Sequence, residues 1–405
     1  MSETTAVVTV GIPSYQCAAF IAEAVASALS QDVDGLDVLV IDDASSDETM
    51  DVLAGFDDPR LRVMRNDVNL GPGRNWNRVV AEARGRYLKV MGCDDVLLPG
   101  SLAAEIAVLE SEPGVEVVTG PRVLVTESGR PLMKRGNGGL RGLVAGAVAG
   151  HEMVRKGSNL VGEPCATLMR TESVRRLGGF DESAPYSIDM DMWLRLIENG
   201  DLHVLERPVA QFRIVGTSWS ASVARTQDSD VAALLRAMAE RGTFGATPAD
   251  AEAGARRARM LAVGRRVVYR VLFDEEMRKR VLYLMVGGWN TLFGYLAFAA
   301  LYYALSQRLS YVLIFVLSYA VSTLNAYWGY KLVVFRTPGR FIREFPRFAI
   351  VYVAALGVNL VVFPWLTRTL GLDPYLSQAV FSVALIVTTY IVNKRFSFRQ
   401  ETSHA

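Results

Sequence analysis

The sequence is poor in the two residue types that most often bind zinc or cross-link a chain. Its 405 residues include 3 histidines and 3 cysteines. The cysteines are far apart in the chain and lack zinc spacing, so we predict neither a disulfide scaffold nor a zinc ribbon and expect a reducing compartment. The scattered histidines argue against a histidine-built zinc site. The hydrophobic share of 51% excludes disorder and collagen-like repeats. The residues concerned are Cys17, Cys93, Cys165, His151, His203 and His404.

Charge is scarce in the last third of the chain. From Arg280 onward the chain carries 11 basic and 3 acidic side chains, whereas the longer part before Arg280 carries 32 basic and 39 acidic ones. The formal net charge of +1 therefore conceals an acidic region and a basic region. The fall in charge density is too large for one globular composition, so we predict two physically different parts, the second with the composition of lipid-embedded protein.

Four stretches without any charged residue lie in this second part, at 281–303, 309–330, 348–367 and 374–393. Each approaches the roughly 20 residues that a helix needs to cross a hydrocarbon core of about 30 Å. The alternative is a soluble helical bundle, but its helices rarely stay uncharged for so long. We therefore predict an all-α domain with four transmembrane helices over 280–400. No basic segment followed by an apolar run opens the chain, so we expect no signal peptide.

Lysine and arginine cluster at alternate ends of these stretches. Three precede the first stretch, five separate the second from the third and three follow the fourth, whereas the other connections hold only Arg308 and Arg368. Basic loops stay on the cytoplasmic side, so both termini and the domain before the helices are expected in the cytoplasm. The prediction is a multi-pass protein of the cell inner (plasma) membrane.

The helical region also repeats weakly. Lys331, Phe335 and Arg336 recur with the same relative spacing as Lys394, Phe398 and Arg399, which indicates two duplicated helix pairs. Three asparagines at membrane depth, Asn290, Asn325 and Asn359, either hydrogen-bond between helices or contact substrate, and we weigh these alternatives equally. The arrangement over about 278–399 resembles the GtrA-like membrane domain, a four-helix module found alone or fused to sugar transferases that act on polyprenyl-phosphate lipids.

The first part alternates predicted strands with predicted helices. Apolar, β-branched runs at 6–12, 37–41, 61–65 and 87–91 predict strands, and helical spacing at 20–29 and 74–83 predicts helices between them. This alternation favours a parallel sheet. Ligands of such sheets bind at the carboxyl ends of the strands, which is where acidic residues cluster here.

Five motifs in order then carry a resemblance: VTVGIPSYQCAAFIAEAVASALSQ, VLVIDDASSDET, NLGPGRNWN, YLKVMGCDDVLLPG and GGFDESAPYSIDMDMWLRLIENG. They resemble family 2 glycosyltransferases of the GT-A fold over about 5–222. The resemblance implies an α/β, Rossmann-like, mostly parallel sheet over 1–225 and an inverting transfer from a nucleotide-sugar donor. The Gln-X-X-Arg-Trp signature of processive synthases is absent, which favours the transfer of a single sugar.

The resemblance places the nucleotide of a UDP-, GDP- or dTDP-linked donor against Pro13, Tyr15, Ile41 and Asp43, with Arg74 facing phosphate or ribose. Each position has a structural alternative. Pro13 and Tyr15 fit a plain turn, and Arg74 fits a solvated side chain at a flexible turn. Asp42, Asp43, Ser45 or Ser46 could cap the helix that begins near Glu48. We favour binding for Asp43 and leave Asp42 undecided.

Asp94 and Asp95 follow the fourth strand and are expected to bind Mg²⁺ or Mn²⁺, which suit hard oxygen ligands and offset charge on a departing nucleotide. Asp94 is also expected to contact the donor. The family usually has Asp-X-Asp, and Gly92 replaces its first acid, which puts a ribose contact in doubt. The alternative is two acids in an ordinary turn.

Asp189 occupies the family position whose aspartate deprotonates the acceptor hydroxyl, with Ile188 where the family has glutamate. We expect Asp189 to be the general base. Asp191, two residues further along a predicted helix, is better explained as an acidic residue near a helix N-terminus.

A connector over 226–279 links the two parts. Thr247 is placed to cap a helix over 248–273 that carries six arginines beside apolar residues. Such a helix before a membrane span is expected to lie in the lipid headgroup plane. The alternative is a solvated linker helix. The arginines are Arg256, Arg257, Arg259, Arg265, Arg266 and Arg270.

Together these features predict an enzyme that moves one sugar to a lipid-linked acceptor, most simply polyprenyl phosphate, at the cytoplasmic face. One alternative acceptor is a hydroxyl of a lipid-linked or cell-envelope glycan. An alternative of another class is a membrane domain that translocates lipid-linked sugar. We expect membrane lipids as partners, a homo-oligomer through the membrane helices and no nucleic acid. The cations expected near the lipid headgroup are Lys331, Arg336, Lys394 and Arg399.

Overall fold

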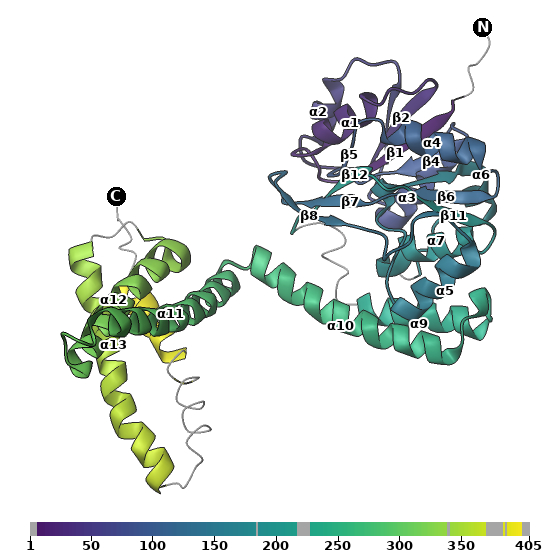
Figure 1. Cartoon of the computed structure of the whole chain (residues 1–405). Coiled ribbons are helices and arrows are strands. Elements are labelled where there is room, and N and C mark those ends of the chain that lie inside the picture. The colour runs from purple at the N-terminus through teal and green to yellow at the C-terminus, as the bar shows by residue number, and fades with distance from the viewer. Residues whose placement is uncertain are drawn as a thin grey trace. The chain divides into compact units, whose positions relative to one another are not determined.

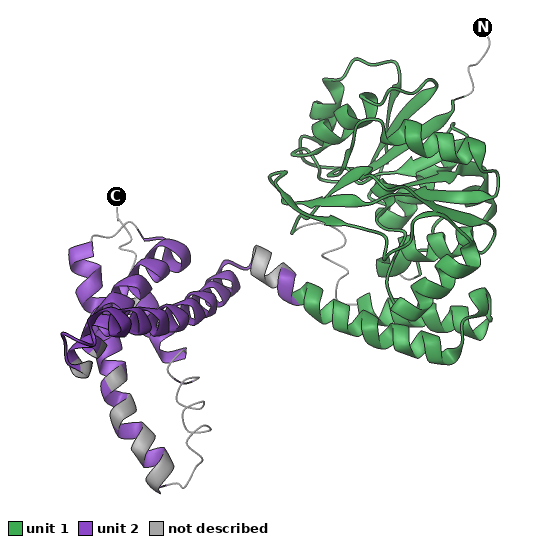
Figure 2. Ribbon diagram, in the orientation of Figure 1, with its two compact units in different colours: residues 1–266 green, residues 267–405 purple. Residues whose placement is uncertain are grey.

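The computed structural model describes residues 6–183, 185–216, 227–337, 341–369, 384 and 387–398. The chain divides into two units, Met1–Arg266 and Val267–Ala405, coloured separately in Figure 2. The division falls inside a long helix, so the first unit includes most of the segment that the sequence assigned to a connector.

Four parallel strands form one half of an eight-stranded sheet in the first unit (Figure 1). They agree with the predicted strands to within two residues at each end, because buried β-branched runs leave little choice of conformation. Their order is β3-β2-β1-β4, so the first strand lies between the second and the fourth. The strands are β1 (Val8–Ser14), β2 (Leu36–Asp42), β3 (Leu61–Arg65) and β4 (Tyr87–Val90).

The sheet continues as β4-β10-β6-β11-β9, with antiparallel pairs except for β6 with β11. A second sheet of four strands has the order β5-β12-β7-β8. The remaining strands are β5 (Val96–Leu97), β6 (Val115–Thr119), β7 (Arg122–Val125), β8 (Pro131–Arg135), β9 (Gly142–Val144), β10 (Thr167–Arg170), β11 (Asp201–Val204) and β12 (Ala210–Arg213).

Helices pack on the large sheet and enclose two hydrophobic clusters. One cluster contains the fully buried Trp193, and the other contains Ile12 and Ile21. The helices are α1 (Ile21–Leu29), α2 (Thr49–Ala54), α3 (Pro72–Glu82), α4 (Ser101–Ser111), α5 (Gly146–Lys156), α6 (Thr171–Arg176) and α7 (Ile188–Ile197).

An ion pair is buried within this unit. Lys89 of β4 donates to Glu105 of α4 at 2.9 Å, and both side chains are fully buried. Lys89 also donates to the carbonyl oxygens of Cys165 and Thr167. Burial raises the pKa of Glu105 to about 7, although the Lys89 ammonium opposes this shift.

The connector packs onto the first unit through two helices, α9 (Gln227–Glu240) and α10 (Pro248–Phe273). As the sequence predicted, α10 begins at Pro248, and Thr247 accepts a hydrogen bond from the Asp250 backbone N–H. One face of α10 is buried through a stripe of small residues, Ala251, Ala255, Ala258 and Ala262. The opposite face exposes Met260, Leu261 and Val263 together with arginines.

Three long helices account for most of the described second unit: α11 (Glu275–Leu305), α12 (Tyr311–Gly329) and α13 (Phe341–Pro364). They coincide with the first three predicted spans, and α12 and α13 each continue into a π-helical turn. Within the described residues, one helix, α11, is long and apolar enough to cross a membrane. Most of the fourth predicted span, and part of the side chains of the third, lie outside the described residues.

The two halves of this unit exchange matching polar contacts. Glu344, at the start of α13, accepts hydrogen bonds from Tyr327 near the end of α12 and from Lys331 just after it. In the same manner, Glu276 at the start of α11 accepts from Lys394 and from Tyr390. Lys331 and Tyr327 occupy the positions of the first repeat that Lys394 and Tyr390 occupy in the second, so each glutamate meets the same pair of residue types.

The buried Lys89–Glu105 pair leads to a stability prediction. Glu105→Gln should destabilise the protein by about 3–5 kcal/mol, because it leaves the Lys89 ammonium buried without a counter-charge. The double variant Lys89→Met, Glu105→Leu should be less destabilised than the single variant, because no unpaired charge remains. Thermal unfolding of the full chain in detergent measures both. A single variant that is as stable as the parent chain would contradict this account of the pair.

Candidate active site

Loops that follow β1, β2 and β4 meet at one edge of the large sheet, because these neighbouring strands run parallel. The register pairs Ser14 with Asp42, so the predicted nucleotide-binding turn after β1 and the predicted acidic pair at the end of β2 lie side by side at this edge. Asp94 and Asp95 follow β4 at the same edge. Parallel pairing thus brings three of the predicted motifs together.

The two acids after β2 have different surroundings. Asp42 accepts from the backbone N–H and the hydroxyl of Ser45, and Arg65 lies 3.4 Å away. These contacts give Asp42 a structural role, which the sequence had left undecided. Asp43 is buried and accepts from the backbone N–H groups of Leu70 at 2.8 Å and Gly71 at 2.9 Å. Asp43 therefore holds the glycine-rich turn at this edge, whatever else it binds.

The other residues predicted to bind the nucleotide-sugar donor differ in how exposed their side chains are. Tyr15 is 50% exposed and presents an open aromatic face beside the half-buried Pro13. Arg74 lies in the first turn of α3 with a side chain that is 69% exposed, 3.6 Å from Glu182. The side chain of Ile41 is fully buried, and its carbonyl oxygen accepts a hydrogen bond from Asn75. Neither the side chain nor the carbonyl oxygen is therefore available to a nucleotide sugar. We therefore omit Ile41 from the proposed site.

The expectation of a reducing compartment without disulfides does not hold for two of the three cysteines. Cys17 and Cys93 form a disulfide with a Cα–Cα distance of 6.4 Å, and Cys165 is free and buried. Their wide separation along the chain gave no hint of this contact. The adjacent strands β1 and β4 place the loops that carry them side by side, and this proximity depends on strand order, which spacing along the chain does not reveal.

Asp94 and Asp95 direct their carboxylates at the position of Gly92. A side-chain Cβ on Gly92 would lie 2.9 Å from both Asp94 Oδ1 and Asp95 Oδ2. Burial raises the pKa of Asp95 well above its usual range, and the neighbouring Asp94 charge raises it further. Burial also raises the pKa of Asp94. Two convergent, partly desolvated carboxylates fit a divalent cation, whose charge would offset their repulsion.

No cluster of three or more histidine, cysteine, aspartate or glutamate residues with metal-binding geometry occurs among the described residues. The pair therefore offers only part of a coordination shell. This fits Mg²⁺, which commonly binds through one or two carboxylates together with substrate phosphates and water.

Arg213, which the sequence analysis did not identify, holds the Asp94–Asp95 loop. Its backbone N–H donates to Asp95 Oδ1 at 3.1 Å, and its guanidinium donates to the Asp94 carbonyl oxygen at 2.8 Å. The same guanidinium pairs with Glu23 of α1 and lies over the ring of Phe20. Arg213 is almost completely buried at the end of β12. Its position in an apolar-rich strand was the only available signal, and it does not distinguish a structural arginine from a site residue.

Asp189 lies in the first turn of α7, and Asn159 donates to its Oδ2 at 2.9 Å. Burial, followed by the charge of Glu163, raises the pKa of Asp189 to about 7. Asn159 is held in turn by Gly162, whose backbone N–H donates to Asn159 Oδ1. Asp191 instead pairs with Arg195 at 2.7 Å, in agreement with its predicted structural role.

Two arginines near Asp189 were also missed. Arg122, which is buried, and Arg135 both pair with Glu163. Burial alone would raise the pKa of Glu163, but the charges of the two arginines hold this pKa at about 2. Arg122 also opposes the rise in the pKa of Asp189. Arg122 and Arg135 face each other across β7 and β8, a register that spacing along the chain did not reveal.

The cations predicted near a lipid headgroup differ in accessibility. Lys331 is buried against Glu344, so its charge is already neutralised within the protein. Lys394 pairs with Glu276 at 2.7 Å but stays 46% exposed, and Arg336 is exposed. Arg399 lies outside the described residues.

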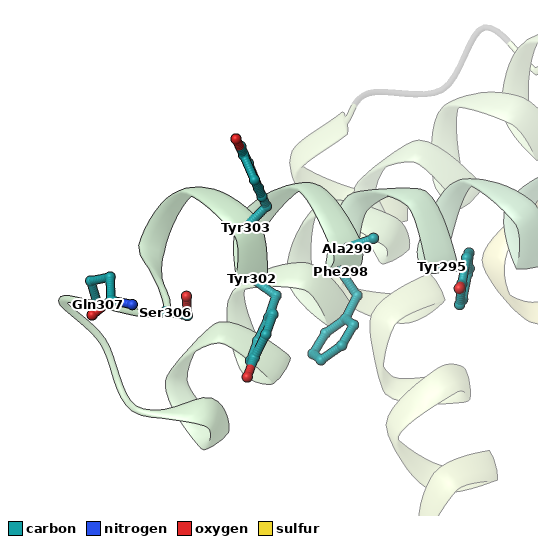
Figure 3. Close-up of a pocket in the computed structure, with 7 residues that line it drawn as sticks. All are labelled: Tyr295, Phe298, Ala299, Tyr302, Tyr303, Ser306 and Gln307. Atoms are coloured by element: carbon teal, nitrogen blue, oxygen red, sulfur yellow. The ribbon is translucent and has the colours of Figure 1, made fainter.

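A shallow pocket lies on the second half of α11, within the second unit (Figure 3). Tyr295, Phe298, Tyr302 and Tyr303 project from the helix there. Aromatic side chains close to the end of an apolar helix are typical of a membrane–water interface. We therefore associate this pocket with the lipid boundary and not with sugar transfer.

Two family models match the chain. Residues 9–178 match Glycosyl transferase family 2, and residues 282–398 match the GtrA/DPMS transmembrane domain. Both matches agree with the resemblances drawn from the sequence.

Three bacterial proteins are similar to parts of the chain. An uncharacterized protein of Mycobacterium tuberculosis, MT1568, is 32% identical over 47% of this chain and 61% of its own length. The succinoglycan biosynthesis protein ExoO of Rhizobium meliloti is 34% identical over 31% of this chain and 36% of its own length. The Escherichia coli enzyme WfaP, named as a UDP-Glc:alpha-D-GlcNAc-diphosphoundecaprenol beta-1,3-glucosyltransferase, is 30% identical over 26% of this chain and 42% of its own length. The chain thus spans less than two thirds of the length of these relatives.

Among solved structures, Staphylococcus aureus TarS 1-349 in complex with UDP-GlcNAc is similar with a TM-score of 0.48 at 19% identity. The match covers 58% of this chain and 66% of that chain.

The convergence at Gly92 leads to a prediction about metal binding. Gly92→Ala should weaken Mn²⁺ binding by about tenfold, because the new Cβ pushes apart two carboxylates that act as ligands. Electron paramagnetic resonance of free Mn²⁺, titrated in the presence of a nucleoside diphosphate, measures the change. Gly264→Ala is the matched control, since a Cβ at Gly264 meets open space. Equal affinity in the two variants would contradict a cation site at Asp94 and Asp95.

Proposed function

From a chain that joins a family 2 glycosyl transferase domain to a GtrA/DPMS transmembrane domain, we propose an enzyme that transfers one sugar from a nucleotide-sugar donor to polyprenyl phosphate. Transfer takes place at the cytoplasmic face of the membrane and inverts the anomeric carbon. The observation that carries the proposal is the meeting of the Tyr15 turn, Asp43 and the Asp94–Asp95 pair at one edge of a sheet whose chain also contains a membrane domain.

The donor nucleotide binds in the turn after β1. Tyr15 offers an exposed ring for stacking against the base, and Pro13 limits the conformations of the turn. Asp43 accepts from the ring N–H of the base through Oδ2, because Leu70 and Asn66 already donate to its Oδ1 and only Gly71 donates to its Oδ2. Arg74, at the start of α3 and largely exposed, reaches phosphate or ribose.

Asp94 and Asp95 hold the divalent cation, Mg²⁺ or Mn²⁺. When bound, the cation supplies positive charge that stabilises the departing nucleoside diphosphate. Arg213 keeps the loop in place by holding the Asp94 carbonyl and, through its backbone N–H, the Asp95 carboxylate.

The acceptor binds on the side of Asp189. Arg122 and Arg135 bring two positive charges there, which the carboxylates of Glu163 and, once ionised, Asp189 offset. The side chain of Arg135 is 35% exposed, and its guanidinium can donate to an anionic acceptor such as a phosphate monoester. The name of WfaP, a beta-1,3-glucosyltransferase for diphosphoundecaprenol-linked GlcNAc, supports a lipid-linked acceptor, but the bond that it names is made to a sugar hydroxyl and not to a phosphate.

A hydroxyl acceptor is the second candidate, and Asp189 is the observation that favours it. A polyprenyl phosphate is already ionised near neutral pH and needs no base, whereas a glycan hydroxyl must lose a proton. A carboxyl group with a pKa of about 7 is well matched to general-base catalysis near neutral pH. With phosphate as acceptor, Asp189 would only have to orient Asn159 and the neighbouring loop.

The exposed face of α10 attaches the catalytic unit to the cytoplasmic leaflet. Its apolar residues Met260, Leu261 and Val263 alternate with Arg256 and Arg259, a pattern suited to the headgroup region. This attachment holds the acceptor side of the catalytic unit at the headgroup region of the cytoplasmic leaflet, where the phosphate of a lipid-linked substrate also lies. Arg336, which is exposed, adds positive charge at a predicted cytoplasmic end of the helices, whereas Lys394 is already paired with Glu276.

Donor screening by nucleotide release tests this function. With purified full-length protein, Mn²⁺ and a panel of nucleotide sugars, one donor should release its nucleoside diphosphate only when polyprenyl phosphate is present. Asp94→Asn should lower this release by at least about 10²-fold, because the cation loses a ligand. Asp34→Asn, an exposed acid in the loop before β2, is the matched control and should retain the activity. Release that is independent of polyprenyl phosphate but requires a glycolipid would favour the hydroxyl acceptor.

The pH dependence distinguishes the two acceptors. For a hydroxyl acceptor, kcat/KM should rise with pH through about 7, because burial raises the pKa of Asp189 and only its ionised form removes a proton. Asp189→Asn should then abolish this limb and lower turnover by about 10²-fold or more. For polyprenyl phosphate we expect no such limb and a loss of less than about tenfold. A loss beyond about 10²-fold with the phosphate lipid would count against a pre-ionised nucleophile.

A further inference from the structure

The hairpin of β7 and β8 ends in an edge strand that is exposed on both faces. β8 pairs only with β7 among the described strands and is the last strand of the smaller sheet. Leu132 is 46% exposed and Met133 59% exposed, although alternate residues of a strand point to opposite faces. The register shifts here, with Met133 opposite Leu124 but Pro131 opposite Val125, so Leu132 is the extra residue of a bulge. Bulges redirect side chains, and this one presents Leu132 beside Met133 at the rim of the sheet.

The charge around this strand is mainly positive, although Glu127 is exposed in the turn that precedes it. The segment from Ser128 to His151 contains no aspartate or glutamate, in a first unit that is acidic overall. Arg130 and Lys134 flank the two apolar residues and are exposed, and Arg141 is exposed a few residues further along. Exposed apolar side chains ringed by exposed cations match the boundary between anionic headgroups and acyl chains.

The strand is poorly suited to the other partner that an exposed edge attracts, which is a strand of a second chain. Pro131 lacks a backbone N–H, Lys134 places a charge on the edge, and the bulge at Leu132 interrupts the regular ladder. All three features oppose strand addition. None of them opposes contact with a lipid surface, which uses side chains and requires no backbone pairing.

We propose that the edge strand of this hairpin, with the residue before it, Arg130–Lys134, docks on the anionic cytoplasmic leaflet as a second lipid contact, independent of α10. The contact acts on the acceptor side of the site, because the strand that carries Leu132 and Met133 ends at Arg135. Arg135 pairs with Glu163, whose charge contributes to the environment of Asp189. A hairpin seated among the headgroups therefore places the lipid surface at the entrance used by a lipid-linked acceptor. This last step rests on the proposed function, whereas the docking itself requires only the membrane domain.

Hydrogen–deuterium exchange of the full-length protein in nanodiscs tests the docking directly. The segment 128–136 should exchange at least about tenfold more slowly in nanodiscs of phosphatidylglycerol and phosphatidylcholine than in phosphatidylcholine alone, because its cations need anionic headgroups. Lys134→Gln should reduce this difference. Arg84→Gln, which removes an exposed cation from another surface of the same unit, is the matched control and should not.

The double variant Leu132→Ser, Met133→Ser tests the role of the apolar side chains. Both residues are exposed, so the fold should survive, and the protection of 128–136 should be lost. The KM for a long-chain lipid acceptor in bilayers should rise about tenfold, while kcat and the KM for the donor stay unchanged. Val63→Ser, at an exposed apolar position on β3, should leave all of these values as they are.

Equal exchange of 128–136 in the two nanodiscs, together with unchanged exchange in the double serine variant, would overturn the proposal. The exchange measurement does not depend on turnover, so it stands even if polyprenyl phosphate is not the acceptor. Loss of protection in the variants without any change in the acceptor KM would keep the docking and reject its link to the acceptor.

Discussion

The burial of like-charged acids at the carboxyl edge of the large sheet is the constraint on which the catalytic unit depends. Asp94 and Asp95 are adjacent and point at the same place, and the pKa of both is raised because neither charge is well solvated. Such a pair persists only where the surrounding structure holds it. Arg213 does so from β12 with contacts to both acids, and Gly92 leaves the space in which they converge. In the proposed function, a cation that enters this space relieves the repulsion between the two carboxylates, and this relief would contribute to the affinity for metal and diphosphate.

The part of this arrangement that follows from local sequence was predictable. Runs of buried β-branched residues identified the first four strands to within two residues, and the acids after them marked the carboxyl edge of the sheet, where we propose that the donor binds. The first three uncharged stretches identified α11, α12 and α13, and Thr247 marked the start of α10. In each case the signal is short-range: hydrophobic period, charge or a capping residue.

The parts that the sequence did not reveal depend on contacts between distant segments. The Cys17–Cys93 disulfide requires knowing that β1 and β4 are neighbours. Arg213 and the Arg122–Arg135–Glu163 group look like ordinary strand or loop residues until the second sheet is assembled. Burial also changed expectations for single residues: Ile41 belongs to the core, and Lys331 is neutralised by Glu344. Neither a motif nor a charge count reports whether a side chain is already occupied.

The membrane domain uses its few acids in a related way. Glu276 and Glu344, at the starts of α11 and α13, each take a lysine and a tyrosine from the other repeat. An unpaired carboxylate at the edge of a bilayer would be costly, so each repeat completes the other. This explains why Lys331 and Lys394 recur at matching positions, although the sequence alone suggested that they contact lipid headgroups.

The same pairing excludes Lys331 and Lys394 as free cations for a lipid headgroup, so the accessible cations are those outside these pairs. In the described residues they include Arg336 of the membrane domain, the arginines on the exposed face of α10, and Arg130 and Lys134 of the hairpin. Positive charge available to an anionic lipid thus lies on the catalytic unit as well as on the helices, which is the distribution expected if the soluble domain itself approaches the lipid phosphate.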